Sequence, residues 1–291
     1  MEPPVCHPFS ALATLRSGRD VPLVTDHIWS AGSLEGLRRP TIAIVGTRAA
    51  TAYGKSLARR FACDLANAGC AIVSGLALGI DAAAHQGALD AGAPTIGILG
   101  GGHARFFPQR NRALAERMIA AGGAVLSPFP PEHAAFPSQF LQRNGIVAAL
   151  ADAVVVIEAP ARSGSLNTAG WAAGRIPVFA VPGDVDRAHV AGCHALIRDG
   201  AILARSAQDI TDDLRLTAPA EDRASRAREL DHALGDELEH RLQGLLSDGE
   251  RSLDELLDET RVDVAKVLAA LSRLEVRGSV EARPGQRYSL R

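Results

Sequence analysis

Short apolar runs alternate with amphipathic segments from residue 41 to about residue 205. The apolar runs predict strands, and the segments between them, where apolar residues recur every three or four positions, predict helices. Strands are expected at 41–46, 71–75, 95–100, 123–128, 153–159 and 177–183, with a short edge strand at 201–204. Helices are expected near 54–68, 80–91, 110–121 and 138–150, and a further helix begins at Ser165 or Thr168.

This alternation predicts the fold class. Uninterrupted apolar strands that alternate with helices are typical of a parallel sheet covered by helices on both faces. We therefore predict an α/β protein whose main domain, residues 41–214, is a Rossmann-like doubly wound parallel sheet.

The segments on either side follow other patterns. Residues 1–40 contain several prolines and glycines and predict a short, irregular N-terminal lead-in. Residues 215–235 lack an apolar stripe over most of their length and predict a linker. Residues 236–291 predict three amphipathic helices and then a hairpin with Pro284-Gly285 as its turn. Three helices and a hairpin together indicate a small winged helix-turn-helix domain.

The charge of this C-terminal domain bears on its partner. Residues 236–291 carry nine Arg and Lys against twelve Asp and Glu. A recognition helix for duplex DNA usually brings more positive charge. The balance favours contact with protein, or support of a dimer, over contact with DNA, and both alternatives stay open.

Composition limits the remaining possibilities. No apolar run reaches the ~18 residues of a membrane span, and the start MEPPVCHPFS lacks a signal-peptide pattern, so we expect a cytoplasmic protein with no membrane contact. The four cysteines show no C-x-x-C pairing, which predicts free thiols and no metal site. The net charge of −2 does not suit a protein that coats nucleic acid by bulk attraction, so any anion site must be local.

Gly, Ser and Arg gather in the turns that follow the predicted strands. Ligands of open α/β sheets bind at the carboxyl ends of the strands, so these turns are expected to form one pocket. The turn GTRAATAYG lacks G-x-G-x-x-G, so NAD is not expected, and no other cofactor is predicted. The loop RSGSLNTA opens a helix, and the free N–H groups of a helix N-terminus suit phosphate. The candidate phosphate-binding residues are Gly46, Thr47, Arg48, Ser74, Gly75, Arg143, Asn144, Arg162, Ser163, Gly164 and Ser165.

Few polar residues near these turns suit bond cleavage, so no catalytic residue is predicted. Asp81 either caps the helix that follows it or contacts the ligand, and a structural hydrogen bond from Asp81 to His85, one helical turn away, is favoured over catalysis. His103 is expected to be solvated, and Glu158 to orient an arginine or the N–H groups of a loop. The pair Phe106-Phe107 either stacks on bases or packs in the core.

Six motifs carry a resemblance to a known family. In chain order they are VGTRAATAYG, IVSGLALGIDAAAH, GILGGG followed by FFPQRN, FLQRNGIVAAL, VVVIEAPARSGSLNTA and VFAVPG. This ordered set resembles the DNA processing protein A (DprA or Smf) family, many of whose members also have a winged-helix tail. The resemblance implies a homodimeric, Rossmann-like protein of natural transformation that binds single-stranded DNA, protects incoming strands and loads the RecA recombinase. It places the Gly46-Arg48 turn, the Arg143-Asn144 pair and the Ser163–Ser165 loop in the phosphate pocket.

The chain departs from the family pattern at four positions. Thr47 stands where the family usually has Ser, and Gly145 stands where a second Arg usually follows Arg143 and Asn144. Pro128 replaces a common Glu, and His194 a common Asn. The loss of the cation at Gly145 is expected to weaken phosphate contact or to transfer that role to Arg162.

The alternative is a nucleotide-processing enzyme or a nucleotide sensor, because related Rossmann-like phosphoribohydrolases cleave nucleoside monophosphates. Their signature resembles P-G-G-x-G-T-x-x-E, with the Glu on a helix. The corresponding loop here, ARSGSLNTAGW, has no acid on the following turn. The missing carboxylate favours binding over cleavage.

Overall fold

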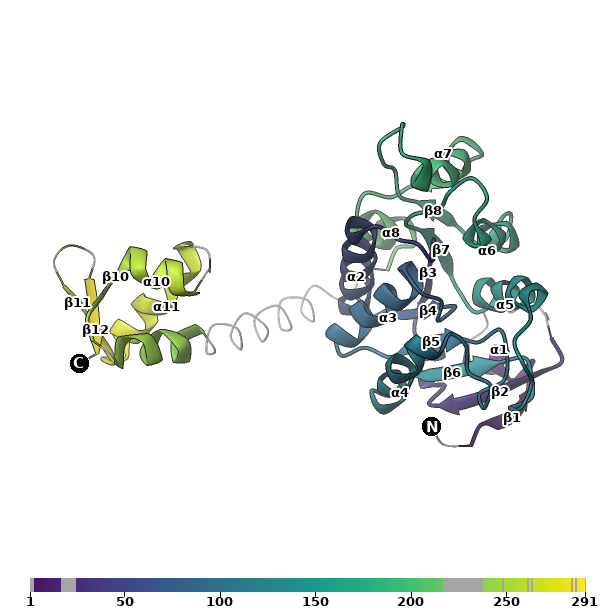
Figure 1. Cartoon of the computed structure of the whole chain (residues 1–291), viewed down its shortest axis with the longest axis horizontal. Coiled ribbons are helices and arrows are strands. Elements are labelled where there is room, and N and C mark those ends of the chain that lie inside the picture. The colour runs from purple at the N-terminus through teal and green to yellow at the C-terminus, as the bar shows by residue number, and fades with distance from the viewer. Residues whose placement is uncertain are drawn as a thin grey trace. The chain divides into compact units, whose positions relative to one another are not determined.

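The computed structural model describes residues 3–16, 25–216, 238–247, 249–260, 262, 264–283, 285 and 287–290. The chain divides into two compact units, Met1–Ala218 and Pro219–Arg291. The first unit is a sheet between two layers of helices, and the second is a small helical unit with a hairpin (Figure 1).

Nine strands form the sheet of the first unit, in the order β1-β2-β6-β5-β4-β3-β7-β8-β9. All pairs from β6 to β9 are parallel, which confirms the predicted parallel sheet. The strands are β1 (Val5–Pro8), β2 (His27–Gly32), β3 (Thr41–Val45), β4 (Ala71–Ser74), β5 (Thr95–Ile98), β6 (Ala124–Ser127), β7 (Ala153–Val156), β8 (Val178–Ala180) and β9 (Ile202–Leu203).

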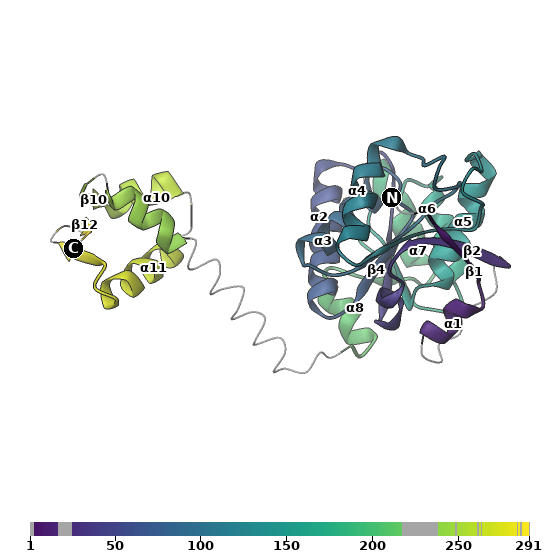
Figure 2. The same cartoon turned by 90° about the horizontal axis from the view of Figure 1, so that it is seen from below.

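Of the eight helices described in the first unit, five (α2 to α6) lie within a few residues of the positions that the apolar pattern predicts, and three were not predicted. They are α1 (Ala11–Leu15), α2 (Ala52–Asn67), α3 (Ile80–Asp90), α4 (Arg112–Ala120), α5 (Pro137–Ala149), α6 (Gly164–Ala172), α7 (Ala191–Arg198) and α8 (Ala207–Asp213), with short 3-10 turns at Glu35–Arg38, Gln109–Asn111 and Ala188–Val190. The α2, α3 and α4 helices cover one face of the sheet, and α5 and α6 cover the other (Figures 1 and 2).

Both faces of the central strands are buried, and alternate residues enter different cores. Ile42 and Ile44 of β3 pack with the α2 and α3 side chains, whereas Ala43 and Val45 pack with α5 and α6. This two-sided burial explains why the strands are continuous apolar runs rather than alternating ones.

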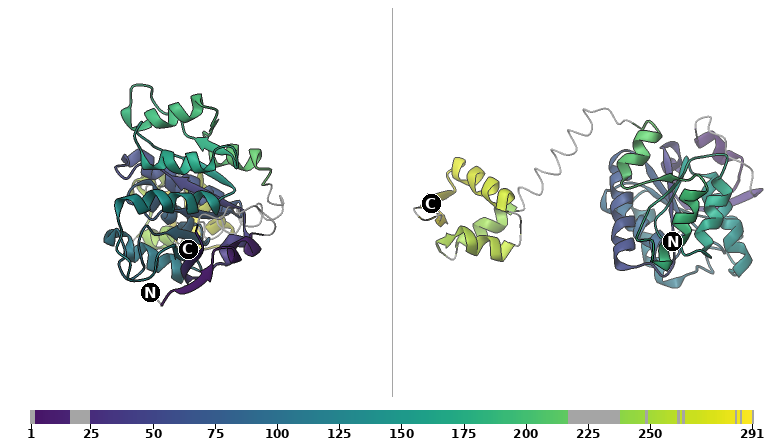
Figure 3. Two further views of the ribbon diagram at one scale, coloured as in Figure 1. Left: turned by 90° about the vertical axis from the view of Figure 1, so that its right-hand side faces the viewer. Right: turned by 90° about the horizontal axis from the view of Figure 1, so that it is seen from above.

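The prediction that residues 1–40 are irregular was wrong. Strand β1 pairs antiparallel with β2, and β2 pairs antiparallel with β6, so this segment extends the sheet at one edge. The purple N-terminal segment lies along that edge in the left panel of Figure 3. Both strands are partly exposed and lack the continuous apolar run that revealed the central strands.

The order of the sheet reverses between β3 and β7. Strands β3 to β6 follow one another in one direction, and β7 to β9 follow in the other. The loops after β3 and β7 therefore leave the sheet on opposite sides and open a crevice between them, where doubly wound sheets bind ligands.

The second unit contains three helices and a three-stranded sheet. Residues 238–247 form the first helix, and α10 (Leu253–Thr260) and α11 (Val264–Val276) follow. The hairpin of β11 (Val280–Arg283) and β12 (Arg287–Leu290) adds β10 (Arg251–Ser252), which completes the predicted winged helix. Residues 217–235 of the predicted linker and Pro284 of the predicted turn lie outside the described residues.

Among the described residues, every helix is too short or too polar to span a membrane.

Candidate phosphate-binding pocket

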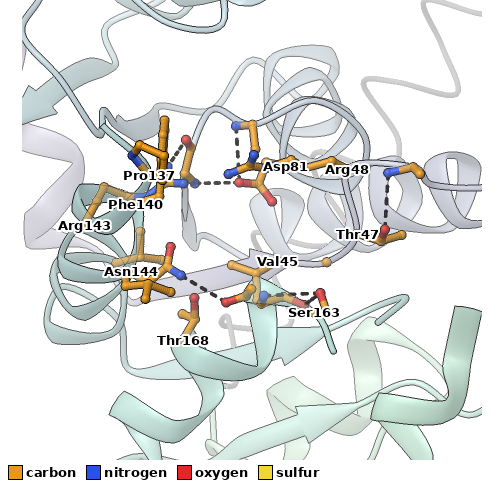
Figure 4. Close-up of a pocket in the computed structure, with 18 of the residues that line it drawn as sticks. Val45, Thr47, Arg48, Asp81, Pro137, Phe140, Arg143, Asn144, Ser163 and Thr168 are labelled. Carbon is orange, nitrogen blue, oxygen red and sulfur yellow. Dashed lines mark hydrogen bonds between the residues drawn. The ribbon is translucent and has the colours of Figure 1, made fainter. Parts of the chain in front are cut away.

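The crevice at the β3–β7 reversal is a pocket of about 710 Å³. It is walled by the turns after β3, β4 and β7, by the first half of α5 and by the N-terminus of α6 (Figure 4). Ten of the eleven predicted residues line it: Gly46, Thr47, Arg48, Gly75, Arg143, Asn144, Arg162, Ser163, Gly164 and Ser165.

Ser74 is the exception. Its side chain is fully buried, and its hydroxyl donates to the Ile44 carbonyl at 2.6 Å, across the β3–β4 pair. Ser74 therefore ties two strands together below the pocket rather than lining it.

The N-terminus of α6 forms one wall. Ser163 is its N-cap, and its Oγ accepts from the Ser165 N–H at 3.3 Å. The Asn144 Nδ2 donates to the Gly164 carbonyl at 3.0 Å and so fixes the loop against α5. A Cβ at Gly164 would meet nothing within 4 Å, so the backbone here is open to the pocket. The free N–H groups of the first helical turn and the helix dipole favour an anion at this wall.

Two exposed arginines face the pocket. Arg48 follows β3, and Arg162 precedes α6. Within the described part of the chain neither makes a hydrogen bond or an ion pair with an acidic side chain, so both guanidinium groups can bind a ligand. The Arg48 guanidinium lies 5.1 Å from the centre of the Phe140 ring, a cation–π contact that leaves its N–H donors unused.

Arg143 has a different role. Its side chain is buried, and Nη1 donates to the carbonyls of Gly75 and Ile98, the latter at 2.7 Å. Burial lowers the pKa of Arg143 to about 10, so the group stays charged at neutral pH. Arg143 therefore connects α5 to the ends of β4 and β5 and acts on the pocket mainly by fixing its shape.

Asp81 lies opposite Arg143 and is also buried (Figure 4). Its Oδ2 accepts from the N–H groups of Gly75 at 3.1 Å and Ala77 at 3.3 Å, so it orders the turn after β4. Burial raises the pKa of Asp81, and the Arg143 guanidinium opposes that shift. The capping interpretation was wrong, because Gly79 is the N-cap of α3 and Asp81 bonds to the turn before the helix.

Two histidine predictions were also wrong. His85 bonds through Nδ1 to the Thr95 hydroxyl at 2.7 Å, not to Asp81. Burial, with a further contribution from Arg143, lowers the pKa of His85 to about 3, so the ring is neutral at pH 7. His103 is buried, and its Nε2 lies 3.0 Å from the Val125 carbonyl. Both rings belong to the core.

Of the two roles predicted for Glu158, the structure shows the second, in which it orients backbone N–H groups of a loop. Its carboxylate accepts from the Thr51 N–H at 3.0 Å and the Thr51 hydroxyl at 2.5 Å. Thr51 is in turn the N-cap of α2 and accepts from the Gly54 N–H at 2.9 Å. Glu158 thus fixes the start of α2 from the end of β7, behind the pocket.

Aromatic residues supply the apolar part of the wall. Phe106 is buried in the core, whereas Phe107 is 52% exposed and lies 5.9 Å from the Phe140 ring, between centroids. Sequence reasoning missed Phe140 and Leu141. The available signal was helical spacing, because Phe140 precedes Arg143 by three residues and therefore shares its face of α5.

The four departures from the family pattern lie in four different surroundings. Gly145 lies against the Trp171 indole of α6, and Pro128 is buried after β6. The Nε2 of His194 lies 3.0 Å from the Gly183 carbonyl after β8. Thr47 keeps a hydroxyl, which accepts from the Ala49 N–H at 3.2 Å and shapes the turn before α2.

Comparison with known proteins assigns the family. Residues 11–215 match the family model described as DNA recombination-mediator protein A, and residues 218–286 match the DprA winged helix domain. A Mycobacterium tuberculosis protein named for DNA processing protein DprA is 40% identical over 269 residues, which make up 91% of this chain and 68% of that protein.

Solved structures agree with this match. The X-ray structure of DNA processing protein A from Streptococcus pneumoniae is 38% identical, with a TM-score of 0.60 over 64% of this chain and 66% of that one. DNA processing protein A from Helicobacter pylori, whose single-stranded DNA binding mode has been described structurally, is 30% identical, with a TM-score of 0.60 over 67% of this chain and 93% of that one. The chain therefore belongs to the DNA recombination-mediator protein A family, also called DprA or Smf.

Proposed function

We propose that this protein binds single-stranded DNA through the pocket at the β3–β7 reversal. One observation carries the proposal. Arg48 and Arg162, which have no acidic partner among the described residues, line the same pocket as the open N-terminus of α6. A guanidinium can meet a phosphate with two parallel hydrogen bonds, and a helix N-terminus offers backbone donors to the same group.

The size and lining of the pocket support a single strand over a duplex. A cavity of about 710 Å³ suits a ligand the size of one nucleotide. The Phe107 and Phe140 rings lie beside the cationic groups, so a base and its phosphate would each meet a matching surface. Duplex DNA keeps its bases stacked inside and could present only its backbone to this opening.

The acid in the pocket lining supports binding rather than cleavage. Asp81 is the acidic residue among the described lining residues, and one of its oxygens already accepts two backbone N–H groups. A general base needs a lone pair within reach of the proton that it removes. The phosphoribohydrolase-like alternative therefore has no well-placed carboxylate, and we propose a binding protein without chemistry of its own.

Family membership supports a wider role. We propose a cytoplasmic homodimer that protects incoming strands in natural transformation and loads RecA onto them. The edge strand β9 supports a dimer, because Ile202 and Leu203 are 39% and 43% exposed at an unpaired edge of the sheet. Such an edge carries unpaired backbone N–H and C=O groups with which a second chain can pair.

A competition titration tests the proposal. Purified full-length protein is titrated with labelled oligo-dT in the presence of unlabelled oligo-dT or a hairpin duplex, and base release from AMP is measured in parallel. We expect oligo-dT to compete far better than the hairpin, with no release of adenine. Equal competition by both would contradict strand preference, and adenine release that depends on Asp81 would favour the enzyme.

A further inference from the structure

A tryptophan is exposed next to the pocket, on the helix whose N-terminus forms the pocket wall. Trp171 is 42% exposed and lies in the last turn of α6. Its indole covers Gly145 of α5, where a Cβ would lie 3.1 Å from Trp171 Cε2. A contact of that length is tighter than ordinary packing. A side chain at residue 145 would therefore crowd the indole, and glycine leaves it room to pack against α5.

The position of Trp171 continues the wall of the pocket. Thr168 lines the pocket and precedes Trp171 by three residues, one helical turn, a rise of about 4.5 Å. On α5, Gly145 follows Asn144, a lining residue, and lies one turn after Leu141, which lines the pocket and is 50% exposed. Leu141 and Gly145 lie on the same face of α5, and Trp171 covers Gly145, so this face of α5 leads from the pocket toward Trp171.

We propose that Trp171 stacks on a base of single-stranded DNA, at the nucleotide next to the one held in the pocket. The inference rests on the proposed function, and it adds a second contact outside the pocket. An exposed indole beside a phosphate site offers a flat ring to whichever base follows, and stacking accepts every base because each has a π-face. Glycine at position 145, where the family usually has an arginine, removes a cation from this surface. Because glycine has no side chain, it also leaves room for the Trp171 indole to pack on α5.

If Trp171 stacks on a base, its contribution to the affinity should require bases in the strand and should not change with salt concentration. Trp171→Ala should weaken binding of oligo-dT about tenfold, within the range for loss of one stacked base. Trp171→Phe should recover most of the affinity, because it keeps an aromatic face. Neither change removes a cation, so the dependence of affinity on salt should stay as in the wild type.

The experiment uses the full chain and two ligands, oligo-dT and a strand of the same length with abasic sites. The wild type should prefer oligo-dT, and Trp171→Ala should lose much of that preference while melting at the wild-type temperature. The chain has two tryptophans, so Trp29→Phe leaves Trp171 as the fluorescent reporter. Oligo-dT should quench its emission, and the abasic strand should quench it much less.

The outcomes separate the two proposals. A wild type that binds oligo-dT, with unquenched Trp171 and unchanged affinity in Trp171→Ala, overturns the stacking contact alone. A wild type that ignores oligo-dT overturns both the proposed function and this inference. Quenching in the Trp29→Phe protein needs no change at residue 171, so it tests the contact even where Trp171→Ala fails to fold.

Discussion

Arginines are arranged differently in the two units of this protein. In the first unit, Arg48 and Arg162 reach the pocket without an acidic partner among the described residues. In the second unit, each described arginine donates to an acidic side chain or a backbone carbonyl, or forms an ion pair with an acid, as Arg283 does with Glu250 at 4.0 Å. These are Arg241, Arg251, Arg273, Arg277, Arg283 and Arg287.

The third helix of the winged helix shows the contrast most clearly. Glu239 is buried and accepts from Arg273 at 2.5 Å and from Arg277, just after α11, at 2.7 Å. In helix-turn-helix proteins the recognition helix supplies the cations that meet DNA. Here two of those cations neutralise an acid inside the unit itself. The total number of arginines in a domain is therefore a poorer indicator of nucleic-acid binding than the number of arginines that have no acidic partner.

The largest expected effect comes from the arginine that is built into the first unit. Arg143→Met should destabilise this unit by about 3–5 kcal/mol, because it leaves the Gly75 and Ile98 carbonyls without their donor and Asp81 without a counter-charge. Thermal melting followed by circular dichroism measures the loss. The matched control is Arg48→Met, which removes an exposed guanidinium and should melt within about 0.5 kcal/mol of the wild type. Equal melting of the two variants would remove the distinction between a structural and a ligand-binding arginine.

A smaller effect, on binding and not on stability, is expected at Arg48. Arg48→Ala should cost about 1.5–3 kcal/mol in affinity for single strands, the scale of a hydrogen bond to a charged group. The slope of affinity against salt should fall by about 0.7, one phosphate's share for single strands. Arg48→Lys should recover only part of the affinity, because an ammonium cannot form the paired contact. The measurement is a filter-binding series at several salt concentrations.

Thermal melting decides how the Arg48 result is interpreted. The structure contains no acid paired with Arg48 in the described residues, so the variant should keep its melting temperature. A variant that melts early, and loses binding only in proportion to its unfolded fraction, would assign Arg48 to the fold instead.

The sequence predicted the parallel sheet, the helices α2 to α6 and the place of the pocket, because each depends on local pattern. A strand that is buried on both faces is a continuous apolar run in the sequence. The turns with Gly, Ser and Arg directly follow those runs, so their place at the ends of the strands can be predicted. Strands β1 and β2 were missed because they are partly exposed and carry few apolar residues, and because β6, the strand that joins β2 to the sheet, lies far along the chain.

The polar core was harder to predict than the pocket. Arg143 could be placed at the pocket by motif, but its bonds run to the ends of β4 and β5, more than 40 residues away in the sequence. His103 is a second example, because its partner is a carbonyl of β6, 22 residues away in the sequence. Such contacts depend on which strands become neighbours, and local spacing does not carry that information.

The smallest expected effect tests the second unit directly. A truncated protein that ends at Ala218 should keep single-strand affinity within about tenfold of the full chain, roughly 1.4 kcal/mol. The cut falls at the boundary between the two compact units, after Leu214 and Leu216, which pack on the core of the first unit. Internal pairing of the tail arginines is the reason for the small effect. A homodimer that bound DNA through its C-terminal domains would lose far more than tenfold, because each chain would lose its main contact.

Glu239→Gln in the full chain sharpens the result, since it keeps the shape of the acid but leaves Arg273 and Arg277 without its charge. If their pairing is what keeps the tail off DNA, this variant should bind a hairpin duplex measurably better than the wild type. A large loss on truncation would instead mean that the winged helix binds DNA with its arginines paired, and the contrast between the two units would fail.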